Sequence, residues 1–481
     1  MLEPAYQVDV VIVGAGIAGL SAAHRLTSAG VTTAVLEAAP YVGGRMSTEK
    51  VDGFRLDRIG QLLSTSYPEL RRTAGLDSLT LRRFAPGVLL HRDGRTHRAG
   101  APAAAGSARA HSMWCAPWQA PQGPGGRAGP GRCAGGRRGR PGPPGRRPGP
   151  DRRHPVERLL SRPEQPAAQA LAARGVPART IDGFLRPLLA ALLCDPELTT
   201  SSRCADLALH SFASGRLCVP EGGAEVLPEL LAGALPPGTV RTGVRVTSVS
   251  TTSVTTAEHG EIRCRAVLLA TDARAAAELL PGLRVPDFHP VTVVHHTTDE
   301  PAAVLATGTS LLLDADRGGP VAHTAVLSNV DPSRAPAGRV LISSTVLGTP
   351  PDGIDTAVRI HLSRLYGTST RRWETLAVHH TPQAIPAMRP PHDLRRPVRL
   401  LAGLYVCGDH RDTSTVQGAL HSAHRAAAAV LADLGRRVRC TARTRHPVCP
   451  GRRRRPEGAR DRIDMRLRRV GATSHDGGVT G

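Results

Sequence analysis

The chain has 481 residues, enough for two or three domains around a large buried core. Hydrophobic residues make up 40% of it, aromatic residues only 3%, and the formal net charge is +22. Such a charge is typical of proteins that bind nucleic acid or anionic membranes. However, two arginine-rich tracts, residues 101–155 and 436–481, carry 19 of the 22 net positive charges. The rest of the chain is close to neutral, which argues against a general polyanion-binding surface.

Cysteine usage and the N-terminus bear on the cellular compartment. The nine cysteines are odd in number, scattered, and form no C-x-x-C pair. This pattern indicates neither a disulfide framework nor a structural zinc site, and we predict no metal site. No basic segment precedes the first apolar run, and no run is long enough to span a membrane. We therefore expect a cytoplasmic protein.

The first organised stretch, residues 8–45, reads VDVVIVGAGIAGLSAAHRLTSAGVTTAVLEAAPYVGGR. A short β-branched run that ends at a glycine is typical of a buried strand in a parallel sheet. Residues 17–28 have the pattern of a helix, and residues 33–36 predict a second strand that ends in Glu37. Gly14, Gly16 and Gly19 have the G-x-G-x-x-G spacing between the first strand and the helix. The whole order is that of a dinucleotide-binding βαβ unit.

Each part of this motif has a chemical reason. Gly14 makes the tight turn, Gly16 lets the backbone approach a pyrophosphate, and Gly19 packs helix on strand. The helix N-terminus offers N–H groups to the phosphates, and Glu37 can accept hydrogen bonds from a ribose. An acid at this position favours an unphosphorylated ribose, hence FAD or NAD over NADP. The alternative is a βαβ unit that binds no nucleotide.

Further elements follow in chain order. Residues 51–56 predict a short hairpin element, residues 67–76 a helix, and residues 88–98 a hairpin with Asp93-Gly94 as its turn. Beyond the first tract we expect helices at 167–173 and 181–193, and a turn followed by a helix within 217–231. Alternating residues at 240–254 predict a strand. Buried strands are expected at 267–270 and 403–409, β-rich runs at 291–346, and a long helix at 415–434.

The tract at 101–155 has no period of 2 or 3.6, and proline and glycine interrupt every segment of it. Three interpretations stay open. The tract is either a disordered basic linker or a nucleic-acid-binding arm with Trp114 and Trp118 as stacking residues. The third is that it is translated in the wrong frame, since shifted GC-rich codons yield Gly, Pro, Arg and Ala. The tract at 436–481 has the same character. We assign no partner to either tract.

Several separated motifs together resemble one family, the FAD-dependent amine-oxidase superfamily, which includes protoporphyrinogen oxidases and phytoene-type desaturases. The first motif with its trailing G-G-R resembles the family's dinucleotide signature. DGFRLDRIGQ, FLRPLLAALLCDPELTTSS, VPEGGAEVLPELLA, VRVTSV with AVLLATDA, and GLYVCGDHRDTSTVQGALHSAHRAAAAVL resemble later family segments in family order. The resemblance covers most of residues 8–98 and 180–435.

The resemblance implies FAD as the cofactor and a site for it. Gly14, Gly16 and Gly19 would hold its pyrophosphate, Glu37 the adenosine ribose, and Gly44 and Arg45 would lie along the phosphates and flavin. By the same resemblance, the remaining residues expected around the cofactor are Gly60 and Gln61 near the isoalloxazine, Val246 at the adenine, Asp409 at the ribityl or pyrophosphate, and Gln417, Gly418 and Ala419 closing the flavin pocket.

Departures from the family pattern refine this expectation. No cysteine has the context of a covalent flavin link, so FAD should be bound non-covalently. The amine-oxidising branch has a mid-chain lysine beside the flavin, whereas Lys50 is the last lysine of this chain. The low aromatic content also disfavours an aromatic cage for an amine. These departures favour the desaturase or porphyrinogen-oxidase side, and no catalytic residue is assigned.

The expected fold class is α/β: a Rossmann-like FAD-binding domain, of the two-dinucleotide-binding-domain flavoprotein type, with an interleaved α+β substrate domain. The FAD-binding domain would use residues 1–98, 240–275 and 396–435, the substrate domain residues 156–239 and 276–395, with the tracts at 101–155 and 436–481 outside both.

The expected function is that of an oxidase or desaturase that takes a hydride from a C–H of a hydrophobic small molecule to flavin N5 and passes electrons to oxygen or another acceptor. Specific nucleic-acid binding is not expected, and a peripheral membrane contact stays open. The alternatives are a basic nucleic-acid-binding protein that works through its arginine tracts, and a frameshifted flavoprotein without function.

Overall fold

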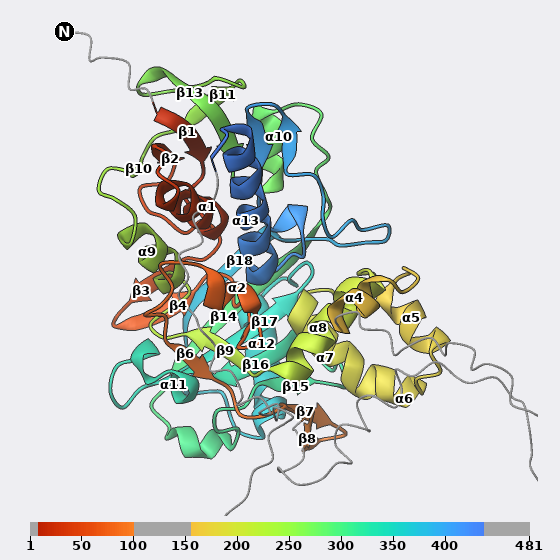
Figure 1. Ribbon diagram of the computed structural model, residues 1–481. Coiled ribbons are helices and arrows are strands. Elements are labelled where there is room, and N and C mark those ends of the chain that lie inside the picture. Colours follow the sequence, from red (N-terminus) through yellow and green to blue (C-terminus); the bar gives the residue numbers. More distant parts are fainter. Residues whose placement is uncertain (1–7, 101–154, 437–481) are drawn as a thin grey trace, which may run out of the picture. The chain divides into compact units, whose positions relative to one another are not determined.

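The computed structural model describes residues 8–100 and 155–436 (Figure 1). The expectations for the arginine-rich tracts therefore fall outside the described residues, apart from Pro155 and Arg436 at their borders, and stay predictions. Within the described ranges, no helix is long and apolar enough to cross a membrane.

The first sheet has eight strands and a parallel centre. β1 pairs in parallel with β2 on one side and with β13 on the other. Further out, β2 pairs in parallel with β10, and β13 pairs in parallel with β20. An antiparallel hairpin, β11–β12, extends the sheet beyond β13, and β19 pairs with β20. Its strands are β1 (Val8–Val13), β2 (Thr33–Glu37), β10 (Val240–Thr242), β11 (Val246–Val249), β12 (Ser253–Thr256), β13 (Gly260–Leu269), β19 (Arg399–Leu401) and β20 (Leu404–Val406).

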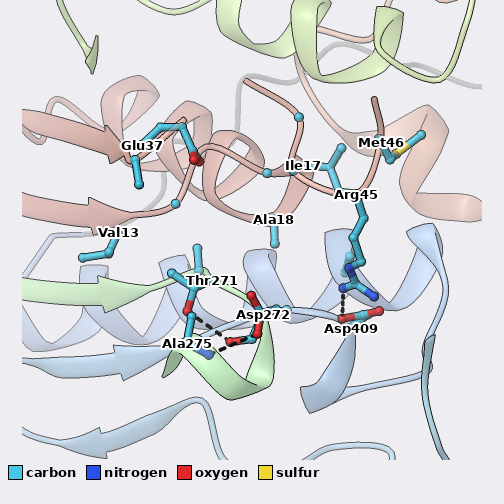
Figure 2. Close-up of a pocket in the computed structure, with 18 of the residues that line it drawn as sticks. Val13, Ile17, Ala18, Glu37, Arg45, Met46, Thr271, Asp272, Ala275 and Asp409 are labelled. Atoms are coloured by element: carbon cyan, nitrogen blue, oxygen red, sulfur yellow. Dashed lines mark hydrogen bonds and ion pairs between the residues drawn. The ribbon is translucent and has the colours of Figure 1, made fainter. Parts of the chain in front are cut away.

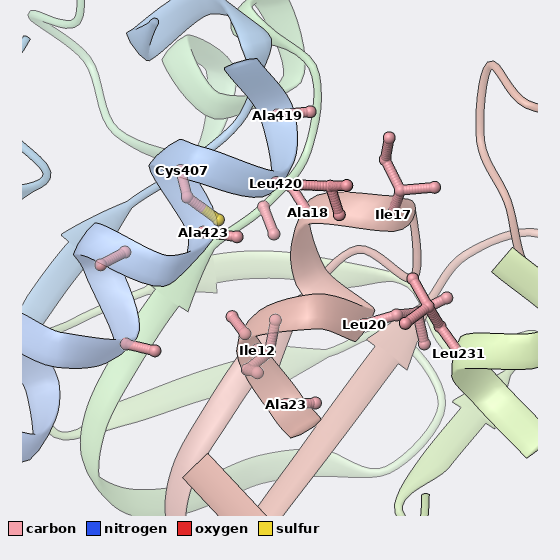
Figure 3. Close-up of a cluster of buried hydrophobic side chains, with 14 of the residues drawn as sticks. Ile12, Ile17, Ala18, Leu20, Ala23, Leu231, Cys407, Ala419, Leu420 and Ala423 are labelled. Atoms are coloured by element: carbon pink, nitrogen blue, oxygen red, sulfur yellow. The ribbon is translucent and has the colours of Figure 1, made fainter. Parts of the chain in front are cut away.

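Both faces of the parallel centre are covered, which explains why β1 is apolar and buried from Val10 to Val13. One face carries α1 (Ile17–Ser28), the crossover between β1 and β2, beside the long α13 (Val416–Asp433) and α9 (Val226–Gly233). Figure 3 shows this core, in which Ile12 and Cys407 lie close to Ala18 and Leu20 of α1 and Ala423 of α13. Alanine on the facing sides of α1 and α13 allows the helices to pack closely.

The second sheet has seven strands in the order β18-β14-β17-β16-β15-β7-β8. One face packs on α12 (Ile354–Tyr366), around the buried Trp373. The other face packs on α7 (Arg186–Leu193), α8 (Ser202–Ser214) and the segment that contains Ile59. Its strands are β7 (Val88–Arg92), β8 (Arg95–Ala99), β14 (Phe288–Thr298), β15 (Leu312–Asp314), β16 (Val321–Val326), β17 (Val340–Leu347) and β18 (Glu374–Pro386).

Smaller elements connect the two sheets. β3 (Thr48–Val51) and β4 (Phe54–Asp57) form a hairpin, and β5 (Leu63–Ser64), β9 (Leu217–Pro220) and β6 (Leu81–Arg83) form a three-stranded sheet. The remaining helices are α2 (Pro68–Arg72), α4 (Pro155–Leu160), α5 (Ala167–Ala173), α6 (Ala178–Thr180), α7 (Arg186–Leu193), α8 (Ser202–Ser214), α10 (Ala273–Leu279) and α11 (Leu327–Val330). A π-helical turn (Ile181–Leu185) precedes α7, and the 3₁₀ turns are Ala302–Leu305, Pro332–Arg334 and Asp409–Arg411.

The predicted helices and strands are more often confirmed in their type than in their length. The hairpin at 88–98 is present, and Asp93 and Gly94 both have positive φ (51° and 69°), as its two-residue turn requires. The helix predicted at 67–76 stops at Arg72, because Thr73 is extended and Gly75 has φ +90°. The strand predicted at 240–254 is divided into β10, β11 and the start of β12 by turns at Gly243 and residues 250–252.

Candidate cofactor-binding site

A cavity of about 610 Å³ lies at the carboxyl ends of β1, β2 and β13. Open parallel sheets bind ligands at this edge, and the volume is in the usual range for ligand sites. Among the residues expected around a cofactor, the first motif contributes Gly14, Gly16, Glu37, Gly44 and Arg45 to the wall, and later motifs contribute Gln61, Val246, Asp409 and Ala419. Segments from positions 13 to 419 of the chain thus meet at one cavity.

The glycine-rich turn between β1 and α1 has the geometry that its spacing predicts. Gly14 has φ +104°, and a Cβ there would lie 3.0 Å from the Ala270 carbonyl oxygen. A Cβ on Gly19 would lie 2.0 Å from the Gly14 carbonyl oxygen, so only glycine lets α1 approach the turn. At Gly16, by contrast, a Cβ would meet no atom within 4 Å and would project into space along the cavity wall.

The first turn of α1 faces the cavity. Gly16 is its N-cap and supplies no side-chain cap, while Ile17 and Ala18 also line the wall (Figure 2). The first N–H groups of a helix have no partner within the helix and favour an anion. The space beside Gly16, together with these N–H groups, is the cradle that a pyrophosphate needs.

Glu37 ends β2 at the cavity wall, and its carboxylate is held by the backbone. Oε2 accepts a hydrogen bond from the Ala15 N–H (2.7 Å), and Oε1 accepts one from the Ala39 N–H (2.9 Å). The carboxylate therefore has a fixed orientation, and its remaining lone pairs are free to accept ribose hydroxyls. This arrangement fits an unphosphorylated ribose.

Arg45 and Asp409 form an ion pair at the cavity. The Nη2 atom of Arg45 lies 2.6 Å from Oδ1 of Asp409, and Nη1 donates to the Ala384 carbonyl (2.8 Å). The two side chains point toward each other in Figure 2. Burial alone would lower the pKa of Arg45, but the charge and hydrogen bond of Asp409, with the charge of Asp272, raise it. Arg45 is therefore a permanent cation beside the cavity.

Four of the residues expected at the site do not line the cavity and support its wall. They are Gly19, Gly60, Gln417 and Gly418. Gly60 faces Thr345 and Val293 of the second sheet. The Gln417 side-chain oxygen accepts a hydrogen bond from the Glu69 N–H (3.0 Å). A Cβ on Gly418 would lie 1.9 Å from the Thr413 carbonyl oxygen, so this glycine permits close packing at the start of α13.

The cavity also has wall residues that sequence reasoning did not assign. Asp57, Asp272 and Glu278 contribute carboxylates, and Ala384 and Ile385 reach the wall from β18. Asp272 lies between the apolar end of β13 and α10, whose N-cap it is, a position that could have suggested it. No local pattern indicates β18, because its approach to the cavity depends on how the second sheet packs.

The described cysteines are buried, like Cys204, Cys218 and Cys407, or half-buried, like Cys194 and Cys264. None of those in the described ranges lines the cavity. Burial raises the pKa of Cys407 to about 12, only slightly offset by the charge of Arg411, and burial likewise raises that of Cys218 to about 12. Both thiols are therefore neutral near pH 7, and a thiolate is the form that reacts.

Comparisons with known proteins agree with this geometry. The family described as "Flavin containing amine oxidoreductase" matches residues 17–431. The chain belongs to this family. Family membership and the α/β flavoprotein fold, both expected from the sequence, are thereby confirmed.

Among curated relatives, putrescine oxidase of Kocuria rosea is 45% identical over 98 residues, which are 20% of this chain and 20% of that protein. The carotenoid 3,4-desaturase of Haloarcula japonica is 53% identical over 49 residues, 10% of each chain. The sequence matches thus span about a fifth or less of the curated relatives' length.

Solved structures resemble the whole fold. Putrescine oxidase bound to putrescine has a TM-score of 0.61 at 20% identity, with 89% of this chain and 100% of that chain covered. A protein assigned as a protoporphyrinogen oxidase from an Exiguobacterium species has a TM-score of 0.63 at 16% identity, with 90% and 99% covered. At these identities the likeness establishes the fold.

Proposed function

We propose that the chain is an FAD-dependent oxidoreductase, an oxidase or desaturase, that removes a hydride from a C–H of a hydrophobic small molecule. The observation that carries the proposal is the single cavity on which the glycine-rich turn, Glu37, Arg45 and Asp409 converge. FAD, when bound there, would supply the hydride acceptor. The protein's residues bind it, orient it and set the charge around it.

The geometry supports the following proposed roles. The turn at Gly14–Gly16 and the first N–H groups of α1 would hold the pyrophosphate, with Glu37 at the ribose and Val246 at the adenine. Arg45 would place a positive charge beside the phosphates and flavin, held in orientation by Asp409. Gln61, Ile59, Ile385 and Ala419, which also line the cavity, would give a largely apolar wall for the flavin ring.

FAD is proposed to be bound without a covalent link. In the described ranges no cysteine reaches the cavity, and burial keeps the Cys407 thiol protonated. Acid precipitation of the purified protein should release all of its flavin into the supernatant. Flavin retained in the precipitate would contradict this part of the proposal.

The substrate is proposed to be apolar rather than a polyamine. Lys50, the one lysine of the sequence, pairs with Glu225 at 3.1 Å and does not line the cavity. The wall residues proposed for the flavin end, Ile59, Ile385 and Ala419 beside Gln61, are mainly aliphatic. The electron acceptor, oxygen or another molecule, and a peripheral membrane contact stay predictions, as does a cytoplasmic location.

Purification and visible spectroscopy test the cofactor. We expect the flavin absorption bands in the isolated protein, or after FAD is added to it. Anaerobic mixing with putrescine and with an acyclic carotenoid then tests the substrate class: the carotenoid should bleach the flavin and putrescine should not. A protein that neither contains nor takes up FAD would overturn the proposed function, and bleaching by putrescine alone would overturn the substrate class.

A further inference from the structure

Arg334 is a fully buried arginine outside the cavity. It lies in the 3₁₀ turn Pro332–Arg334, with 0% of its surface exposed. Its Nη1 atom lies 2.9 Å from Oδ2 of Asp57, its Nε atom 3.0 Å from Oδ2 of Asp331, and Nη2 donates to the Pro220 carbonyl (3.1 Å). Arginine is almost never fully buried unless it is paired.

The partners of Arg334 belong to the cavity wall or hold it in place. Asp57 and Pro220 line the cavity directly. Oδ1 of Asp57 accepts a hydrogen bond from the N–H of Ala224, another wall residue (2.9 Å). Asp331 accepts one from the Gly222 N–H (2.8 Å). A residue of the second half of the chain thus fixes the β4 end and the turn after β9.

The charge of the wall gives this arrangement a consequence for ligand binding. Five carboxylates line the cavity, against the two cationic side chains Arg45 and Arg245. The carboxylates are Glu37, Asp57, Asp272, Glu278 and Asp409. An anionic dinucleotide would be repelled by such a wall, because like charges repel and the repulsion is stronger at a protein surface than in bulk water. Arg45, a wall residue, pairs with Asp409. Asp57 pairs instead with Arg334, which lies behind the wall.

We propose that Arg334 is a positioning residue for the cofactor: acting through Asp57, it neutralises a carboxylate of the wall and so allows an anionic dinucleotide to bind. The inference rests on the proposed FAD site. Without Arg334, Asp57 would be a buried, uncompensated anion at the cavity, while Asp331 would be one outside it.

A purely structural role makes a different prediction. Replacing a buried ion network by apolar or neutral groups is often neutral for stability, whereas removing one partner is costly. If Arg334 mattered only for folding, then in a variant without it, neutralising either Asp57 or Asp331 would restore the protein equally well. If it matters for the cofactor through Asp57, the position of the remaining charge decides the affinity for FAD.

Two double variants with equal net charge make this comparison. Arg334→Met with Asp57→Asn leaves its remaining carboxylate at Asp331, outside the cavity, whereas Arg334→Met with Asp331→Asn leaves it at Asp57. We expect the first to bind FAD within a few-fold of wild type and the second at least about tenfold more weakly. FAD is titrated into the apo-protein and followed by flavin fluorescence, with urea unfolding of each apo-variant measured alongside.

Arg339→Met is the matched control for loss of an arginine. Arg339 lies five positions on, pairs with the exposed Glu374 at 2.9 Å, and does not line the cavity. It should bind FAD like wild type. If wild type binds FAD but the two double variants have equal FAD affinity, the role of Asp57 is overturned while the proposed function stands. A wild-type protein that takes up no FAD would instead overturn the proposed function, and the inference with it.

Discussion

The guanidinium of Arg45 lies 2.6 Å from the carboxylate of Asp409, across 364 positions of the sequence. Arg45 follows the glycine pair of the N-terminal motif, and Asp409 begins the 3₁₀ turn before α13. Asp409 is buried, with 6% of its side chain exposed, while a third of the Arg45 side chain is exposed. The pair therefore joins the two halves of the candidate FAD site and leaves part of the cation available to a ligand.

Replacing Arg45 by methionine should lower FAD affinity by at least about tenfold, because it removes a charge-assisted contact and leaves Asp409 uncompensated. Affinity is measured by titrating the apo-protein with FAD. Arg58→Met is the control: Arg58 forms an exposed pair with Glu49 at 3.4 Å, and such pairs contribute little. Equal affinities in the two variants would contradict a role for Arg45.

Two glycines of the first motif should respond differently to substitution. Gly19→Ala places a Cβ 2.0 Å from the Gly14 carbonyl, so we expect a clear loss of thermal stability. Gly16→Val places its side chain in open space along the cavity, so the apo-protein should melt near wild type but no longer bind FAD. Unfolding temperatures and FAD titrations separate the two effects. Unchanged FAD affinity in Gly16→Val would contradict the placement of the pyrophosphate.

A partly buried pair between α13 and α2 should make the fold sensitive to acid. His424 Nδ1 lies 2.6 Å from Oε2 of Glu69, and its Nε2 lies 3.1 Å from the Ser21 hydroxyl. Burial would raise the pKa of Glu69, but the hydrogen bond and charge of His424, with the charges of His421 and Arg72, lower it below 4.5.

Because that pKa is lower in the folded state, the stabilisation is present above pH 4.5 and disappears as the pH falls through the folded-state value. Urea unfolding of wild type should show this loss. His424→Gln should be less stable at neutral pH, with a smaller further loss on acidification. Parallel pH curves for the two proteins would show that the pair contributes nothing to the acid response.

The cap of α13 should couple stability to cofactor binding. The Thr415 hydroxyl accepts a hydrogen bond from the Gly418 N–H (3.1 Å), and Thr415, Val416 and Ala419 line the cavity. Thr415→Ala should lower the free energy of unfolding by about 1 kcal/mol and weaken FAD binding. The control is Ser201→Ala at the start of α8, away from the cavity, which should lower stability without changing FAD affinity. The measurements are urea unfolding and FAD titration.

The sequence by itself determined the local parts of the site. Gly14, Gly16, Gly19 and Glu37 could be placed because strand, turn and helix are encoded within a few neighbouring residues. Gly14 and Gly19 meet steric requirements of the turn, whereas Gly16 leaves space along the cavity wall. The hairpin turn at Asp93-Gly94 could be predicted for the same reason: two consecutive residues must adopt positive φ.

Tertiary structure alone decided the rest. Gln417 and Gly418 belong to a motif expected at the flavin, yet the first binds the Glu69 backbone and the second packs on Thr413, because the first turn of α13 directs those positions away from the cavity. The burial of Arg334 between Asp57 and Asp331 has no local signature. Ion pairing and cavity charge depend on contacts between residues hundreds of positions apart, and only the packing of the two sheets brings those residues together.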